Sequence, residues 1–109
     1  VIVRTEELVS HAIERMRNLK ISQLPVIDIN GFAGSLNESD LFNAYLADAN
    51  IIEKPIREIM GAAYPMVKAN ASIEEVSKLI TKENQAVLVE LENGKHHIIT
   101  KFDIINAIK

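Results

Sequence analysis

The sequence has no cysteine, few aromatic residues and no long uninterrupted apolar segment. The absence of cysteine excludes a disulfide framework, a thiolate zinc site, an iron–sulfur site and a thiol nucleophile. No apolar run approaches the roughly 20 residues that span a bilayer. Arg4, Glu6 and Glu7 interrupt the first apolar stretch, so no signal peptide is expected either. A cytoplasmic location is therefore the expectation.

The sequence also lacks a large excess of either charge, because 12 Lys and Arg against 15 Asp and Glu give a formal net charge of −3. This balance gives no electrostatic reason to expect nucleic acid or an anionic membrane as a partner. Hydrophobic residues make up 48% of the 109 residues, which is ordinary globular composition. The chain enters an apolar, strand-like run at its first residue, so we expect it to be a piece of a longer protein.

The most informative feature that is present is an internal repeat. Segments of the two halves match in the same order at a spacing of 62 to 64 residues (Gln23 to Gln85 is 62, Ile2 to Met66 is 64). The matching segments are 2–4 with 66–68, 23–28 with 85–90, 30–31 with 93–94, and 40–44 with 103–107. This pattern predicts a first repeat over 1–47, a connector over 48–63 and a second repeat over 64–109.

Each repeat is predicted to form a strand, a helix, a hairpin and a second helix. Helices are expected to start at Thr5 and at Ser72, since each precedes glutamates and an apolar period of helical type. The pairs Asn30-Gly31 and Asn93-Gly94 predict tight turns. The remaining predicted elements are strands at 2–3, 24–27, 32–36, 66–67, 86–89 and 97–100, and helices at 41–47 and 104–108.

These elements predict an α+β fold made of tandem β-α-β-β-α repeats. A half of about 45 residues buries too little surface to stand alone, so the halves are expected to share a core about a pseudo-twofold axis. Small ligands tend to bind in clefts at such a seam. In the connector, Ile56, Ile59 and Met60 are expected to form a short helical turn against the core.

The end of each repeat carries the side chains best suited to binding. Asn37 and Thr100 each lie three residues before an aspartate that opens a predicted helix, Asp40 or Asp103. One interpretation is capping, in which the aspartate accepts backbone N–H groups and contributes about 1 kcal/mol. The other is that the carboxylate accepts hydrogen bonds from the vicinal hydroxyls of a ribose. The duplication favours the second, because capping does not require the short polar residue to recur at the same offset.

Together these motifs resemble a CBS-domain pair, also called a Bateman module, over essentially all 109 residues. The resemblance lies in segments 24–28, 56–60 and 98–104, in this order. It implies a noncatalytic regulatory module that binds an adenosyl compound (AMP, ADP, ATP or S-adenosylmethionine) in one or two clefts. It also implies a homodimer.

Residues 21–28 and 98–108 are further similar to the C-terminal regulatory domain of bacterial cystathionine β-synthase. In that family a pyridoxal-phosphate catalytic domain precedes the module and condenses serine with homocysteine. The resemblance therefore implies the catalytic domain of a parent enzyme as a partner, S-adenosylmethionine as effector, and pyridoxal phosphate only in that parent domain. No catalysis is expected of this chain.

The resemblance also assigns binding residues. Thr100 and Asp103 would hold the ribose. The full set for this cleft is Thr100, Asp103, Ile98, Ile99, Ile21, Ser22, Gln23 and Leu24, and a second, weaker cleft would use Asn37, Asp40, Asn84, Gln85 and Ala86.

The chain departs from the family pattern at three positions. Ser22 replaces an aspartate of the animal enzymes, which removes a charge-assisted contact worth about 1.5–3 kcal/mol. That loss would weaken S-adenosylmethionine binding or switch the ligand. Asn37 stands where Ser or Thr is usual, and His97 stands where glycine is usual.

Other interpretations remain open. In a purely structural dimerisation module, the aspartates would only cap helices, and Phe42, Tyr45 and Leu46 would form core or dimer interface. A stand-alone enzyme is disfavoured, because no residue set supplies a nucleophile, a base and oxyanion support together. No metal site is expected at His96 and His97, since neighbours on a strand point to opposite faces.

Overall fold

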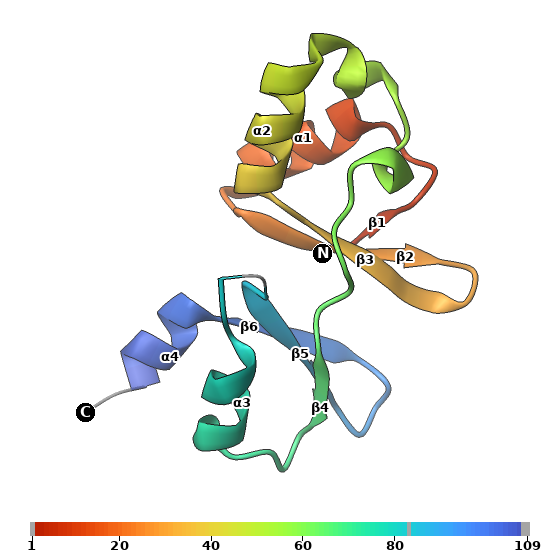
Figure 1. Cartoon of the computed structure of the whole chain (residues 1–109). Coiled ribbons are helices and arrows are strands. Elements are labelled where there is room, and N and C mark those ends of the chain that lie inside the picture. The colour runs from red at the N-terminus through yellow and green to blue at the C-terminus, as the bar shows by residue number, and fades with distance from the viewer. Residues whose placement is uncertain (1, 83, 108–109) are drawn as a thin grey trace. The chain divides into compact units, whose positions relative to one another are not determined.

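The computed structural model describes residues 2–82 and 84–107, and its chain divides into two compact units, Val1–Ala63 and Tyr64–Lys109. Each unit contains one three-stranded sheet with helices packed against it (Figure 1). The predicted α+β class and the order of elements within each repeat are confirmed.

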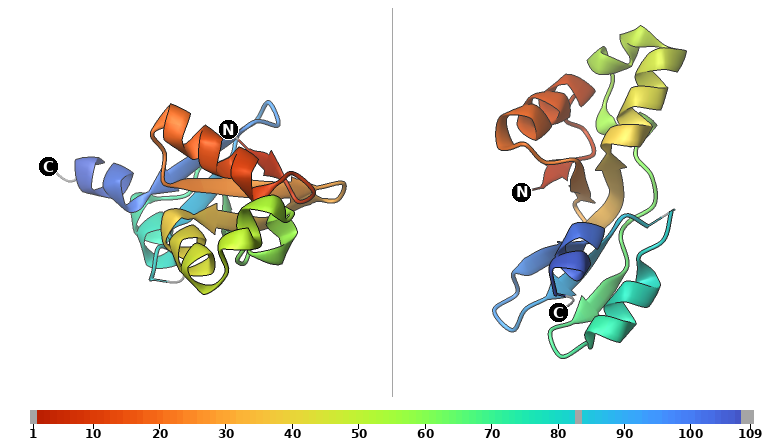
Figure 2. Two further views of the ribbon diagram at one scale, coloured as in Figure 1. Left: turned by 90° about the horizontal axis from the view of Figure 1, so that it is seen from above. Right: turned by 90° about the vertical axis from the view of Figure 1, so that its left-hand side faces the viewer.

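In the first unit, the sheet has the strand order β1-β2-β3, with β1 parallel to β2 and β2 antiparallel to β3. The elements are β1 (Val3–Arg4), α1 (Val9–Leu19), β2 (Gln23–Asp28), β3 (Gly31–Asn37) and α2 (Glu38–Ala47). They are followed by two short 3-10 helices, η1 (Ala49–Glu53) and η2 (Ile56–Glu58). Helices α1 and α2 lie on the same face of this sheet (Figures 1 and 2).

The core of the first unit is built from the strands, both helices and the connector. Its buried residues are Val3, Val9, Ala12, Met16, Leu24, Val26, Leu36, Leu41, Ile51 and Ile56. Leu24, Pro25 and Val26 are consecutive and all buried, so both faces of this strand are covered here, which explains the continuous apolar run in its sequence. Ile56 is fully buried, and Ile59 and Met60 pack against the same core, as predicted for the connector.

The connector is also hydrogen-bonded to the edge strand β3. Ser35 and Gly61 form an antiparallel bridge, with N–H···O distances of 3.1 and 2.8 Å in the two directions. The buried hydroxyl of Ser35 donates to the carbonyl of Ala62 at 2.6 Å. A Cβ on Gly34 would stand 2.7 Å from the Gly61 carbonyl oxygen and from Met60 Sδ, so only glycine lets the connector approach this closely.

The predicted start of the first helix at Thr5 is wrong, because α1 begins at Val9. Thr5 instead continues the pairing of β1, and its N–H donates to the carbonyl of Ile27 at 3.0 Å. Glu7 then closes a turn, in which its carboxylate accepts from the backbone N–H of Arg4. Leu8 bridges to Pro55 of the connector. Tertiary pairing therefore holds this segment as a turn followed by an extended Leu8, despite its helix-start composition.

The second unit repeats the same topology with shorter helices. Its elements are β4 (Met66–Lys68), α3 (Ile73–Leu79), β5 (Ala86–Glu90), β6 (His96–Thr100) and α4 (Lys101–Ala107), and the strand order is β4-β5-β6. Among the described residues its buried side chains are Tyr64, Val76, Ala86, Val87 and Leu88. The last predicted helix starts earlier than expected, at Lys101, and its predicted end at Ile108 lies outside the described residues.

The start of α3 agrees with the sequence prediction. Ser72 is the N-cap residue, and its hydroxyl oxygen accepts a hydrogen bond from the Glu75 N–H at 3.1 Å. In the described residues, no helix has both the length and the apolar character that crossing a membrane requires.

Candidate ligand-binding site

In each unit, the start of the central strand lies beside the end of its antiparallel neighbour. Gln23 pairs with Asn37 in the first unit, and Ala86 pairs with Thr100 in the second. A helix begins directly after each of these two ends, at Glu38 and Lys101. Polar side chains of the strand entry and of the helix start therefore gather at one end of each sheet.

In the second unit, Thr100 and Asp103 form one hydrogen-bonded group at the start of α4. Asp103 Oδ2 accepts from the Thr100 N–H at 2.8 Å and from the Thr100 hydroxyl at 3.1 Å. Neither bond uses Oδ1, and no other described residue bonds to that oxygen. Because Asp103 is exposed, Oδ1 can accept hydrogen bonds from a ligand.

In the first unit, the side chain of the corresponding pair also donates to Oδ2 of the aspartate, but the backbone hydrogen bond runs in the opposite direction. Asn37 is the N-cap residue of α2, and its Oδ1 accepts from the Asp40 N–H at 2.9 Å. The amide Nδ2 of Asn37 donates to Asp40 Oδ2 at 3.0 Å. The capping interpretation therefore describes Asp103, which accepts a backbone N–H, but it is wrong for Asp40, because Asn37 is the cap of α2 and Asp40 donates its own N–H to it.

The entry to β2 is tied to the start of α2. Ser22 accepts the Glu38 N–H on its carbonyl oxygen at 2.9 Å, and its hydroxyl donates to Gln23 Oε1 at 2.7 Å. Ile21, Ser22 and Gln23 are half-buried and accessible in part. The side chain of Leu24, in contrast, is fully buried in the core, so a ligand could meet only its backbone.

The corresponding segment of the second unit is held by local bonds. The Asn84 N–H donates to Thr81 Oγ1 at 3.2 Å, and Gln85 Nε2 donates to the Lys82 carbonyl at 2.7 Å. Ala86 is fully buried, so its methyl group cannot line an open site. Ile98 and Ile99, on β6 next to Thr100, are half-buried.

The structure thus brings the predicted site residues together in two groups, one per unit. The first group is Ile21, Ser22, Gln23, Asn37 and Asp40, and the second is Asn84, Gln85, Ile98, Ile99, Thr100 and Asp103. Each predicted cleft takes residues from both groups, and the buried Leu24 and Ala86 belong to neither group.

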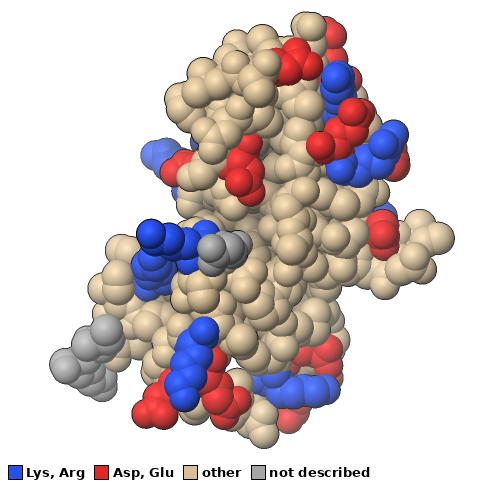
Figure 3. Space-filling model, viewed as in Figure 1, with Lys and Arg blue, Asp and Glu red and all other residues tan. Residues whose placement is uncertain are grey.

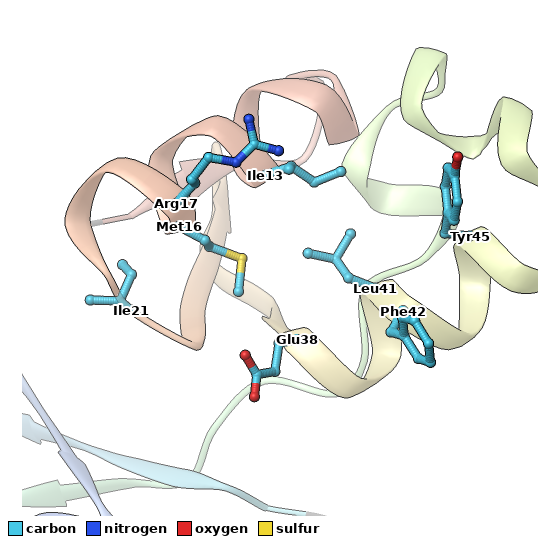
Figure 4. A pocket seen from close by; sticks show the side chains of 8 residues that line it. All are labelled: Ile13, Met16, Arg17, Ile21, Glu38, Leu41, Phe42 and Tyr45. Atoms are coloured by element: carbon cyan, nitrogen blue, oxygen red, sulfur yellow. The ribbon is translucent and has the colours of Figure 1, made fainter.

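A groove between α1 and α2 was not assigned from the sequence. It has a volume of about 320 Å³ and is lined by Ile13, Met16, Arg17, Ile21, Glu38, Leu41, Phe42 and Tyr45 (Figure 4). Phe42 and Tyr45 lie three residues apart in the sequence and so share one helix face. This spacing is the sequence feature that could have indicated the groove. The suggestion that Phe42, Tyr45 and Leu46 are core residues is wrong, because 62%, 48% and 66% of their surfaces are exposed.

Charged side chains and histidines are the remaining candidates for a further binding site among the described residues. On the face shown in Figure 3, acidic and basic side chains are interspersed and neither sign forms a continuous patch. His96 and His97 are both exposed on β6. Over residues 2–82 and 84–107, no group of three or more His, Cys, Asp or Glu side chains is arranged to hold a metal ion.

Solved structures with the same fold are similar over nearly the whole chain. A protein with CBS domains from Burkholderia ambifaria is 26% identical, with a TM-score of 0.82 over 97% of this chain and 79% of the other. The CBS-domain protein ATU1752 from Agrobacterium tumefaciens is 24% identical, with a TM-score of 0.84 over 98% and 82%. CBSX2, a CBS-pair protein known from Arabidopsis thaliana, was solved in complex with AMP; it is 23% identical, with a TM-score of 0.73 over 98% and 85%.

No curated protein matches the sequence. The CBS domain family matches it twice, over residues 1–47 and 56–109. The first match has the bounds of the first predicted repeat, the second begins in the predicted connector and includes the second repeat, and each includes one Asn/Thr-x-x-Asp helix start. The chain therefore belongs to the CBS domain family and carries two copies of the domain.

Proposed function

We propose that this chain is a noncatalytic regulatory module that senses an adenosyl ligand. The observation that carries the proposal is the arrangement at the start of α4. There, Thr100 holds Oδ2 of Asp103 and leaves Oδ1 exposed to accept the hydroxyls of a ribose. The complex of CBSX2 with AMP supports an adenosyl compound as the ligand class.

The residues proposed to contact the ligand are those that the family resemblance assigns, and they come from both repeats. Thr100 and Asp103 bind the ribose, and Ile98 and Ile99 lie beneath it. The half-buried strand entry of Ile21, Ser22 and Gln23 lines the base, with the backbone of Leu24 behind. The weaker second site uses Asn37 and Asp40 with Asn84 and Gln85.

Ligand binding regulates by a shift in population. A ligand that touches both units favours one relative orientation of them, and this biases how the module packs on its catalytic domain. The effect requires that the ligand bind one orientation more tightly than the other.

The parent enzyme in this proposal is a cytoplasmic, cystathionine β-synthase-like lyase, whose separate catalytic domain holds pyridoxal phosphate. S-adenosylmethionine is then the effector, and AMP or ATP is the alternative. Ser22 carries no charge, so the site lacks a carboxylate near the sulfonium of S-adenosylmethionine. This favours a nucleotide over the sulfonium compound if the two compete.

The test is calorimetric titration of the chain with AMP, ATP and S-adenosylmethionine, and of the variants Asp103→Asn and Asp40→Asn. Asn has nearly the same shape as Asp but lacks the carboxylate that accepts both ribose hydroxyls. We expect Asp103→Asn to weaken binding at least tenfold, and Asp40→Asn to have a smaller effect. Binding of all three ligands by Asp103→Asn at parental affinity would contradict the ribose assignment.

A second candidate function is a purely structural dimerisation module, and it is favoured by the exposure of Phe42, Tyr45 and Leu46 on α2. In that case no adenosyl ligand binds a folded sample, and Phe42→Ser with Tyr45→Ser disrupts a homodimer in sedimentation experiments. Under the sensing proposal, the same pair of substitutions leaves the ligand titration of the remaining protein intact.

A further inference from the structure

The two Asn-Gly pairs of the sequence lie in the turns of the two hairpins, but the turns hold the asparagines differently. In the β2–β3 turn, Asn30 is exposed and the neighbouring Ile29 is 97% exposed. The backbone N–H of Asn30 donates to Asp28 Oδ1 at 2.7 Å, whereas its side-chain amide bonds to no described residue. The reactive amide of Asn30 is therefore accessible and not held by a hydrogen bond.

In the β5–β6 turn, the side chain of Asn93 and the backbone N–H of Gly94 are both hydrogen-bonded. The side-chain oxygen of Asn93 accepts from the Lys95 N–H at 3.0 Å. The N–H of Gly94 donates to the Leu91 carbonyl at 3.0 Å. Gly31 is also paired, with Asp28, in the strand register, so the bond that distinguishes the two turns is the one that holds the Asn93 side chain.

An asparagine followed by glycine can lose ammonia spontaneously, because glycine has no side chain to shield its amide nitrogen. Around both Gly31 and Gly94 the space is open, since nothing lies within 4 Å of the position of a Cβ, so this feature does not distinguish the two turns. The Gly31 nitrogen attacks Cγ of Asn30, an N–C bond forms, the Cγ–Nδ2 bond breaks, and ammonia leaves with the proton of the Gly31 N–H. Water then opens the cyclic imide at either carbonyl and yields aspartate or isoaspartate. No oxidant or reductant is needed.

We propose that Asn30 is a site of spontaneous conversion to aspartate and isoaspartate, and that Asn93 converts more slowly. Conversion of Asn30 adds a negative charge two residues from Asp28. Isoaspartate also inserts a methylene into the main chain of a turn that sets the register of Asp28 opposite Gly31. The modification therefore disturbs the β2–β3 hairpin at the end opposite to Asn37.

The test is to age the full chain in mildly alkaline buffer, then digest samples and follow the peptides containing Asn30 and Asn93 by mass spectrometry. Isoaspartate is counted independently by enzymatic methylation. We expect the Asn30 peptide to convert at least several-fold faster than the Asn93 peptide. In concentrated denaturant the two rates should become similar, because the folded turns no longer distinguish the two pairs.

A variant tests whether the hydrogen bond to Asn93 causes the difference in conversion rate. Lys95→Pro removes the N–H that holds Asn93, so it should raise the conversion rate of Asn93 and leave that of Asn30 unchanged. Asn30→Ser should abolish conversion in its own peptide alone. Equal rates in the folded chain, faster conversion of Asn93, or no conversion at Asn30 would each overturn the proposal.

Discussion

The two units share one topology but are not equally well packed. The first unit buries ten hydrophobic side chains in one cluster, and two of them, Ile51 and Ile56, come from the connector. The second unit has shorter helices, and none of the described side chains of α4 is buried. Ile73, Phe102 and Ile105 are each more than half exposed. The difference shows that a duplicated sequence pattern sets topology, while added segments decide how fully a core is closed.

The largest effect is expected from removing the connector's contribution to the first core. Ile56→Ala leaves a cavity at a fully buried position, so the first unit should lose about 2–5 kcal/mol. Hydrogen exchange read separately in each unit measures the loss. The matched control is Ile105→Ala in α4, where an exposed side chain should change stability by less than about 0.5 kcal/mol. Equal losses would contradict the asymmetry.

The next effect concerns the close approach of the connector to β3. Gly34→Ala places a Cβ against the Gly61 carbonyl and the Met60 side chain, so we expect a loss of about 1–3 kcal/mol. In Gly61→Ala the nearest atoms are 3.6 Å from the new Cβ, which is ordinary contact, and the loss should be smaller. Urea unfolding of the two variants tests this order, and the reverse order would mean that the bridge does not constrain β3.

Removing one helix cap from each unit compares the two units, because the two substitutions should cost about the same free energy. Ser72→Ala removes the cap of α3, and Asn37→Ala removes the cap of α2, so each should cost about 1 kcal/mol. Because α3 has only 7 residues against 10 in α2, the loss should appear as fraying of α3 but as a global loss in the first unit. Amide exchange in the first helical turn distinguishes the two behaviours.

The smallest effect is expected at the surface ion pairs. Arg57 lies 3.0 Å from Glu6 in the first unit, and Lys68 lies 3.5 Å from Glu90 in the second, with both pairs largely exposed. Glu6→Gln and Glu90→Gln should each change stability by about 0–1 kcal/mol. Thermal melts at low and high salt measure this, and a large, salt-insensitive loss at either position would show that the pair is not merely a surface contact.

The repeat could be predicted from the sequence because its signals are local. Asn-Gly turns, apolar strands and the Ser72 cap depend on neighbouring residues, and the structure contains all of them. The start of α1 could not be predicted, since Glu7 and Leu8 are kept out of the helix by bonds to the connector far along the chain.

The candidate site could be predicted only in part. The offset between Thr100 and Asp103 is visible in the sequence, and their contact follows from the helix start. The burial of Leu24 and Ala86 could not be read from the same motif, because an apolar residue at a strand entry can face either the core or a cleft. The reversed backbone bond of the Asn37–Asp40 pair also requires coordinates, since an amide can both donate and accept.

The bridge between the connector and β3 has a practical consequence for dissecting the molecule. A recombinant first repeat that ends at residue 47 would lack Ile51 and Ile56 and would expose the apolar surface that they cover. It would also leave the edge of β3 without Gly61 and Ala62, and an unpaired strand edge invites association with other chains. An expression boundary at residue 63 keeps both features, and it is the boundary at which the first repeat should be produced alone.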